Sequence, residues 1–161
     1  MNVAIVKYNA GNIRSVDYAM KRLGVEAVIT ADKEVLMAAD KVIFPGVGEA
    51  ETTMNHLRAT GLDELIKNLR QPVLGICLGM QLLFDSSDEY GFCEGLGLIP
   101  GKVTELPPTP GLMIPHMGWN ENSYVKLTPA TGSQPDFSQL DKQYTYFVHS
   151  YYAVTEPEYI T

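Results

Sequence analysis

Short apolar runs alternate with amphipathic segments through the first half of the chain. Four runs rich in Val and Ile predict strands at residues 3–6, 27–29, 41–44 and 73–76. Apolar residues at helical spacing between these runs predict helices at residues 13–23, 33–39, 49–58 and 61–70. Strands that alternate with helices indicate βαβ units. The first half therefore predicts an α/β fold in three layers, with a mostly parallel central sheet flanked by helices.

Polar residues and glycine mark the expected helix ends. Asn12 is predicted to cap the first helix and Gly24 to close it, and Asp32 is predicted to cap the second helix. The run before Cys77 is long enough for a strand that is buried on both faces.

The character of the chain changes after about Phe92, where frequent glycine and proline leave no room for long helices. Short strands and loops are expected there, and the β-prone segment 145–154 predicts one or two strands. No polar linker separates the two halves. Residues 1–161 are therefore expected to form one domain with a β-rich second half.

Charge and cysteine content exclude several classes of protein. The formal net charge is −7, which argues against nonspecific binding to nucleic acid because such binding needs a basic face. The N-terminus lacks the features of a signal peptide, and no segment approaches the roughly 18 apolar residues that a membrane span needs. Cys77 and Cys93 have neither metal-ligand nor C-x-x-C spacing, so we expect no metal site and a reduced, cytoplasmic protein.

Cys77 lies between Gly75 and Gly79, after the fourth strand and before an apolar segment, residues 78–84, that predicts a helix. A nucleophile elbow of the G-x-S-x-G type needs this strand–turn–helix context, here with sulfur in place of oxygen. The glycines leave room for a strained turn, and a helix N-terminus favours the thiolate. The backbone N–H of Leu78 is expected to point at a developing oxyanion. An inert buried cysteine is the competing interpretation.

Two features could complete a site around the elbow. The segment Pro45–Gly48 follows the third strand, and the carboxyl ends of parallel strands share one edge of the sheet, so it should neighbour Cys77. Its unhindered N–H groups suit a second oxyanion donor, with a plain strand-to-helix turn as the alternative. Gln81 lies one helical turn beyond Cys77, where its amide could bind a polar substrate or face solvent.

Three other positions are open to two interpretations each. Glu89 follows a polar cluster and could bind a substrate ammonium group or end a solvated helix. His149 ends a strand, where it could support a site or lie in the core. The predicted loop at residues 115–120 contains the single Trp, and an exposed Trp beside Pro and Met would suit a partner, although a core Trp is equally common.

Together these segments resemble the class I (triad-type) glutamine amidotransferases, whose fold is flavodoxin-like. The elbow resembles the nucleophile motif of this family, and Pro45–Gly48 resembles its oxyanion strand. Three further segments resemble the branch of the family that serves histidine biosynthesis: Tyr8-Asn9-Ala10-Gly11-Asn12-Ile13-Arg14-Ser15-Val16, Pro115-His116-Met117-Gly118-Trp119-Asn120 and Tyr146-Phe147-Val148-His149-Ser150-Tyr151. The segments occur in the expected order and span nearly the whole chain.

The resemblance implies a glutaminase that uses no cofactor and no metal. Cys77 would be the nucleophile, and the oxyanion would be held by the backbone of Gly46, Val47 and Leu78. The residues implied to contact glutamine are Gly48, Gln81, Glu89 and the backbone of His149, Ser150 and Tyr151. Ammonia would pass to a separate (β/α)8-barrel cyclase subunit in a heterodimer. The implied interface with that subunit consists of Pro115, His116, Met117, Gly118, Trp119 and Asn120.

One feature departs from the family. Its triad is completed by a His-x-Glu pair, usually within Phe-His-Pro-Glu, and residues 1–161 contain no such segment. His149 matches a different position of the family and is not assigned as the base. Residues 159–161 are expected to begin another strand, so we expect a fold whose C-terminal part is missing. An unpaired sheet edge would make the chain poorly stable alone, and the missing pair would leave it nearly inactive.

Three other functions compete with this one. The chain could serve another synthase, such as the one that makes pyridoxal phosphate, although the segment at residues 115–120 argues against that. It could also be a catalytically incomplete, partner-binding protein that keeps the elbow without the base. A redox or metal role for the two cysteines has the least support, because their spacing fits neither.

Overall fold

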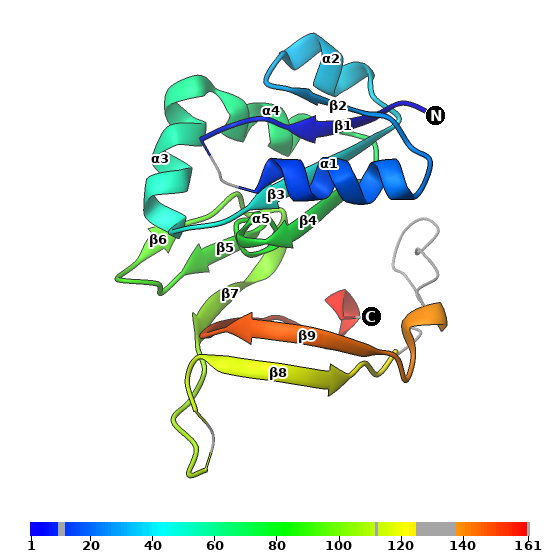
Figure 1. Cartoon of the computed structure of the whole chain (residues 1–161). Coiled ribbons are helices and arrows are strands. Elements are labelled where there is room, and N and C mark those ends of the chain that lie inside the picture. Colours follow the sequence, from blue (N-terminus) through cyan, green and yellow to red (C-terminus); the bar gives the residue numbers. More distant parts are fainter. Residues whose placement is uncertain (10–11, 112, 125–137, 161) are drawn as a thin grey trace.

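A parallel sheet forms the centre of the first half. The structure is a computed structural model that describes residues 1–9, 12–111, 113–124 and 138–160. The strands of this sheet are β1 (Val3–Val6), β2 (Ala27–Thr30), β3 (Lys41–Gly46) and β4 (Val73–Cys77). Their order is β2-β1-β3-β4, and each pairs with its neighbour in parallel (Figure 1). The prediction of a mostly parallel central sheet is confirmed.

Helices cover both faces of this sheet. They are α1 (Ile13–Arg22), α2 (Lys33–Ala38), α3 (Ala50–Thr60) and α4 (Leu62–Asn68). Alternation along β1 divides the core, because successive side chains of a strand point to opposite faces. Val3 and Ile5 belong to the cluster that includes residues of α1, whereas Ala4 and Val6 pack with α2, α3 and α4. The three-layer α/β architecture is therefore confirmed.

Two of the three predicted helix signals have the expected geometry. The Asp32 carboxylate accepts hydrogen bonds from the N–H groups of Glu34 (2.9 Å) and Val35 (3.1 Å), so it caps α2. Gly24 follows α1 with a positive φ of 74°. Asn12 occupies the cap position of α1, but its side chain accepts from the Ser15 hydroxyl and makes no cap hydrogen bond. The prediction of an Asn12 side-chain cap is wrong. Ala10 and Gly11 lie outside the described residues.

The prediction that β4 is buried on both faces is also wrong. Leu74 is 53% exposed and Ile76 is 36% exposed. Both belong to the outer strand of the sheet, and the register pairs Leu74 with Ile43, a residue of the α1-side cluster. Helix α1 therefore covers this face of the sheet only as far as β3, so one face of β4 is exposed to solvent. Val73, on the opposite face, packs against the larger core cluster.

The chain after Cys77 makes only one helical turn. Helix α5 spans Leu78–Gln81, and strand β5 begins at Phe84 (Phe84–Ser87). The predicted helix through Phe84 is therefore too long. Its continuation is prevented because the Leu82 and Leu83 carbonyls accept hydrogen bonds from Leu96 and Leu98. These long-range bonds direct the chain into the second half of the fold.

The second half is rich in strands, as predicted. The first group comprises β5, β6 (Cys93–Glu94), β7 (Ile99–Glu105) and β10 (Tyr151–Val154), in the order β10-β7-β5-β6. A separate antiparallel ribbon contains β8 (His116–Glu121) and β9 (Tyr144–His149), and it lies below the parallel sheet in Figure 1. The segment predicted as one or two strands thus forms two, β9 and β10. The 3-10 turns are η1 (Ser138–Leu140) and η2 (Pro157–Tyr159).

Two expectations about the second half need correction. Residues 115–120 were expected to form a loop, but His116–Glu121 is strand β8, because all six residues pair with β9. Tyr159 ends the η2 turn and does not begin a strand, and Thr161 lies outside the described residues. Among the described helices, none combines the length and the apolar character that crossing a bilayer requires.

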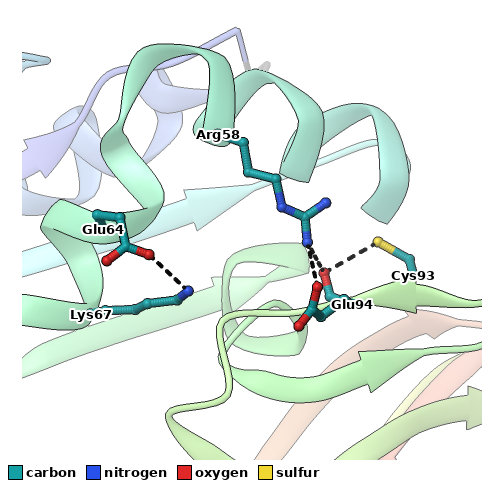
Figure 2. Close-up of polar contacts among 5 residues, drawn as sticks. All are labelled: Arg58, Glu64, Lys67, Cys93 and Glu94. Atoms are coloured by element: carbon teal, nitrogen blue, oxygen red, sulfur yellow. Dashed lines mark hydrogen bonds and ion pairs between the residues drawn. The ribbon is translucent and has the colours of Figure 1, made fainter.

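Helix α3 is tied to the β5–β6 hairpin near both of its ends. At its last turn, Arg58 Nη2 lies 3.0 Å from the Glu94 carbonyl oxygen and 3.4 Å from Glu94 Oε2 (Figure 2). At its first residue, the Ala50 N–H donates to Glu89 Oε2 at 3.0 Å. Figure 2 also shows the ion pair within α4 between Lys67 and Glu64, at 3.1 Å. The contacts made by Arg58 and Glu89 hold the hairpin along α3.

Candidate active site

Cys77 has the backbone geometry of an elbow. It is the last residue of β4 and directly precedes α5, with φ 55° and ψ −121°, and its side chain is exposed. A positive φ is uncommon for a residue with a Cβ and persists only where the surroundings impose it. Because Cys77 is exposed, the competing interpretation of a buried cysteine is wrong for this residue. It fits Cys93, which is only 5% exposed.

The glycines beside Cys77 are required by close backbone contacts. A Cβ at Gly75 would lie 2.6 Å from Met80 Cα, and a Cβ at Gly79 would collide with the Phe44 carbonyl. At Gly46 a Cβ would lie 2.9 Å from the Leu78 carbonyl carbon. Three glycines thus let the elbow pack directly against the end of β3, in agreement with the steric role expected for Gly75 and Gly79.

The predicted oxyanion segment adjoins the elbow. In the register of β3 and β4, Gly46 is paired with Cys77. Val47 and Gly48 follow at the carboxyl end of the sheet, both exposed, and Gly48 has a φ of 101°. The expectation that residues 45–48 and Cys77 are neighbours is confirmed. Pro45 and Gly46 are the last residues of β3, so only Val47 and Gly48 lie in the turn.

A cavity of about 280 Å³ opens beside Cys77. Its lining includes Cys77, Leu78 and all six residues that the resemblance implied for glutamine: Gly48, Gln81, Glu89, His149, Ser150 and Tyr151. They come from four separate parts of the chain, which the fold brings to one place. Gly46 and Val47 do not line this cavity in the described structure and adjoin it through the backbone of β3.

Glu89 has a structural role that its sequence context did not predict. It is half-buried, and its Oε2 accepts the hydrogen bond from the first N–H of α3. Its own N–H donates to the Ser87 hydroxyl at 3.2 Å. The interpretation of Glu89 as the end of a solvated helix is wrong, because residues 84–87 form strand β5. Glu89 lines the cavity, and one of its carboxylate oxygens caps α3.

The two histidines of the ribbon are oriented by their neighbours. His149 Nδ1 lies 2.9 Å from the Tyr151 carbonyl oxygen, and a carbonyl only accepts, so this nitrogen carries the proton. His116 Nε2 lies 2.5 Å from the Asn120 amide nitrogen. The two rings meet edge to face at 5.6 Å between centroids. Within the described residues, no hydrogen bond joins either histidine to Cys77.

A second, larger cavity borders the same cysteine. Its volume is about 560 Å³, and its lining adds Met80 and the aromatic residues Tyr146, Phe147 and Tyr152 to Cys77 and Gln81. The sequence prediction missed these residues as components of a site. The available signal was the high content of aromatic residues along 144–152, which indicates a strand but does not indicate what the strand faces.

The single Trp is on the surface. Trp119 is 68% exposed and Met117 is 55% exposed, and they lie on the same face of β8. Trp119 contacts the ring of Tyr146 at 5.4 Å between centroids. Of the two interpretations of this Trp, the structure therefore excludes the core position.

Cys93 lies apart from this site. Burial raises the pKa of its thiol, and the nearby Arg58 guanidinium partly opposes that shift. Its sulfur lies 3.6 Å from the Glu94 carbonyl oxygen (Figure 2). Both cysteines are free thiols, and the described residues contain no cluster of three or more potential metal ligands.

Comparisons with known proteins agree with the fold and the motifs. Residues 4–161 match the family described as glutamine amidotransferase class-I. The chain is 61% identical over 153 residues to the imidazole glycerol phosphate synthase subunit HisH of Bacteroides thetaiotaomicron, covering 94% of this chain and 74% of that protein. It is 45% identical over 161 residues to the HisH subunit of Listeria welshimeri, covering 98% of this chain and 74% of that protein.

A solved structure described as a glutamine amidotransferase has a similar fold. It superposes with a TM-score of 0.55 at 28% sequence identity, and the match covers 65% of this chain and 57% of that one.

Proposed function

The chain belongs to the class I glutamine amidotransferase family, and on that premise we propose that it is the glutaminase subunit of an imidazole glycerol phosphate synthase. The observation that carries the proposal is the strained, exposed Cys77 in a cavity shared with Gln81, Glu89 and residues 149–151. The HisH names of relatives at 45–61% identity support the choice of synthase.

The proposed reaction is amide hydrolysis by nucleophilic catalysis. The Cys77 sulfur attacks the side-chain carbonyl carbon of glutamine, and the carbonyl oxygen becomes an oxyanion held by backbone N–H groups of Leu78 and the Gly46–Val47 segment. Collapse of this intermediate breaks the C–N bond, and the nitrogen leaves as ammonia after taking a proton. Water then hydrolyses the glutamyl thioester to glutamate and frees the thiol. The pairing of Gly46 with Cys77 supports this assignment.

Substrate binding is assigned to the cavity of about 280 Å³. Gly48, Gln81 and Glu89 contact the glutamine, with the Glu89 carboxylate near its ammonium group. The backbone of His149, Ser150 and Tyr151 receives the substrate carboxylate. Glu89 also caps α3, so its position is set before substrate arrives, which supports a preorganised site.

Ammonia is proposed to pass to a separate (β/α)8-barrel cyclase subunit. There it would join a ribulose-phosphate intermediate to give imidazole glycerol phosphate and an aminoimidazole carboxamide ribotide. Residues 115–120 are the proposed contact with that subunit, and the exposed Trp119 and Met117 on β8 support this. Two unpaired thiols support the expectation of a reducing, cytoplasmic location.

We propose that the 161-residue chain alone hydrolyses glutamine slowly. Each of its three histidines has other neighbours: His149 donates to Tyr151, His116 contacts Asn120, and His56 lies against the ring of Tyr8 at 6.4 Å. Within the part of the chain that the structure describes, no histidine is therefore hydrogen-bonded to Cys77. A His149→Gln variant should keep the pH dependence of Cys77 alkylation. Loss of an inflection that the unaltered chain shows would instead identify His149 as the base.

The proposal is tested with a glutamine-like chloroketone and mapping of the adduct by mass spectrometry. We expect one adduct, at Cys77, whose formation glutamine slows. Cys77→Ser should abolish it, and the matched variant Cys93→Ser should leave it unchanged, because Cys93 is buried. Labelling that glutamine does not slow would contradict the proposed substrate.

Two experiments with the cyclase barrel distinguish the proposed function from two alternatives. Copurification with a cyclase barrel favours the proposed synthase over one that makes pyridoxal phosphate. Glutamine hydrolysis measured with the barrel bound distinguishes an enzyme subunit from a catalytically incomplete, partner-binding protein. The absence of stimulation by the barrel would favour the second alternative.

A further inference from the structure

Tyr8 follows β1 and lies beneath the proposed oxyanion segment. Its side chain is 8% exposed, and its ring contacts Phe44 at 5.6 Å between centroids. Its hydroxyl donates a hydrogen bond to the Pro45 carbonyl, with 2.5 Å between the oxygens. We infer that Tyr8 is a positioning residue that holds the Gly46–Val47 backbone in the geometry needed to bind the oxyanion. This inference rests on the proposed function and adds a residue to its machinery.

The direction of the Pro45 carbonyl follows from the sheet. The N–H of Val42 donates a hydrogen bond to the carbonyl oxygen of Pro72, which lies on the β4 side of β3. Backbone groups of successive residues in a central strand point to alternate sides, so the carbonyl of Pro45 points to the β1 side. There the pairing of β1 with β3 stops at Ile43. Tyr8 therefore supplies the hydrogen bond that β1 no longer provides.

A hydrogen bond to this carbonyl restricts the orientation of the peptide unit to which it belongs and of the peptide unit that follows. The Pro45–Gly46 peptide unit is planar, so fixing its oxygen fixes the orientation of the whole unit. The next peptide, Gly46–Val47, starts from that unit and carries a proposed oxyanion donor. Without the hydroxyl, a buried carbonyl would lack a partner, which favours rotation of this peptide toward another donor.

The same hydroxyl touches the point where β3 meets the elbow. A Cβ built at Gly46 would lie 2.9 Å from the Tyr8 hydroxyl oxygen and 2.9 Å from the Leu78 carbonyl carbon. Gly46 is therefore enclosed between Tyr8 and the backbone that follows Cys77. A small displacement of Tyr8 would be transmitted directly to the spacing between the two proposed oxyanion donors.

The protonation state of Tyr8 suits a permanent donor. Burial, and then the negative charge of Cys77, raise the pKa of the Tyr8 phenol. The hydroxyl thus keeps its proton when Cys77 is a thiolate, and the hydrogen bond to Pro45 persists through the proposed reaction.

The test compares two reactions of Cys77 in the 161-residue chain and its Tyr8→Phe variant. A glutamine-like aldehyde adds to the sulfur and forms a tetrahedral adduct whose oxygen needs the oxyanion donors. Iodoacetamide alkylates the same sulfur by displacement of iodide and needs no oxyanion site. We expect Tyr8→Phe to weaken aldehyde binding about tenfold, less than the 10²–10³-fold typical of deleting an oxyanion donor. The iodoacetamide rate should change less than about twofold, since Phe retains the packing of the ring.

Controls separate this inference from the function it rests on. Tyr18→Phe, at an exposed position on α1, should leave both reactions unchanged. Equal aldehyde binding by Tyr8→Phe and the unaltered chain would overturn the inference and leave the proposed function standing. A parallel fall in both reactions would overturn it as well, because Tyr8 would then be only structural. No aldehyde adduct with the unaltered chain would contradict the proposed function, and the inference with it.

Discussion

At the scale of single residues, what distinguishes the site is backbone geometry imposed on ordinary side chains. Cys77 has a positive φ, and Gly75 and Gly79 are needed because a Cβ at either would collide with neighbouring backbone. The two thiols differ in their positions. Cys77 is exposed at the elbow, whereas burial raises the pKa of Cys93. The environment of each thiol is thus set by its placement in the fold.

The buried phenol of Tyr8 leads to a prediction about the stability of the folded chain at alkaline pH. Its pKa is raised in the folded chain, while an unfolded tyrosine titrates near 10. The protonated Tyr8 phenol therefore makes its full contribution to the free energy of unfolding below about pH 10. Above that pH the contribution falls, by at most about 1.4 kcal/mol per pH unit. The unaltered chain and the Tyr8→Phe variant are compared by urea unfolding. The difference between their free energies of unfolding should be constant from pH 7 to 9 and shrink above pH 10. A difference that stays constant to pH 11 would contradict the burial of a neutral phenol.

At the scale of elements, the local helix signals differ in whether another contact competes with them. Asp32 caps α2 without interference from other elements. Asn12 instead accepts from Ser15, and the helix after Cys77 ends when long-range hydrogen bonds take the carbonyls of Leu82 and Leu83. Local pattern therefore predicts helix position well and helix length less well.

The Asp32 cap is testable with two substitutions. Asp32→Ala removes the acceptor for two N–H groups of α2 and should cost about 1 kcal/mol of unfolding free energy. Asp32→Asn keeps an acceptor oxygen of equal capping strength and should stay within about 0.5 kcal/mol of the unaltered chain. Urea unfolding measures both. Equal losses for the two variants would show that charge, and not the cap hydrogen bond, matters at this position.

The contact between α3 and β6 leads to a second prediction at this scale, about unfolding free energy. Arg58 donates to both the carbonyl and the carboxylate of Glu94, and the carboxylate is largely exposed. Glu94→Gln should therefore cost less than about 0.5 kcal/mol, as expected for an exposed ion pair. Arg58→Met also loses the bond to the carbonyl and should cost about 1 kcal/mol. If Glu94→Gln costs as much in urea unfolding as Arg58→Met, the ion pair is the main contribution.

At the scale of the whole molecule, the open face of β4 is the largest departure from what the sequence predicts. Leu74 and Ile76 are apolar and form part of an outer strand, yet both are exposed. The exposed side chains of β9, including Tyr146 and Val148, add more apolar surface. An outer strand with an apolar face is a template for association.

We expect the 161-residue chain to self-associate as its concentration rises, as measured by light scattering. Leu74→Lys should reduce this association several-fold, because it places a charge on the open face of β4. The control Leu23→Lys changes the net charge equally at an exposed position outside the sheet, and it should have little effect. Equal suppression by both variants would attribute the effect to net charge and not to the face of β4.

The sequence by itself determined the first half of the fold and the position of the elbow at Cys77. The alternation of apolar runs with helical spacing placed four strands and four helices, because burial of one face imposes that spacing on the chain. The Gly-x-Cys-x-Gly pattern marked the elbow, since only glycine fits beside a backbone packed so closely. These are local consequences, readable from residues adjacent in the chain.

Only the tertiary structure decided what surrounds Cys77. It brought residues from four separate parts of the chain to one cavity, turned residues 116–121 into a strand, and set Glu89 on the N-terminus of α3. It also placed the Tyr8 hydroxyl against Pro45, 37 positions away in the chain. Such contacts depend on strand order and register, and those arise from the packing of the whole chain, which no local pattern of residues records.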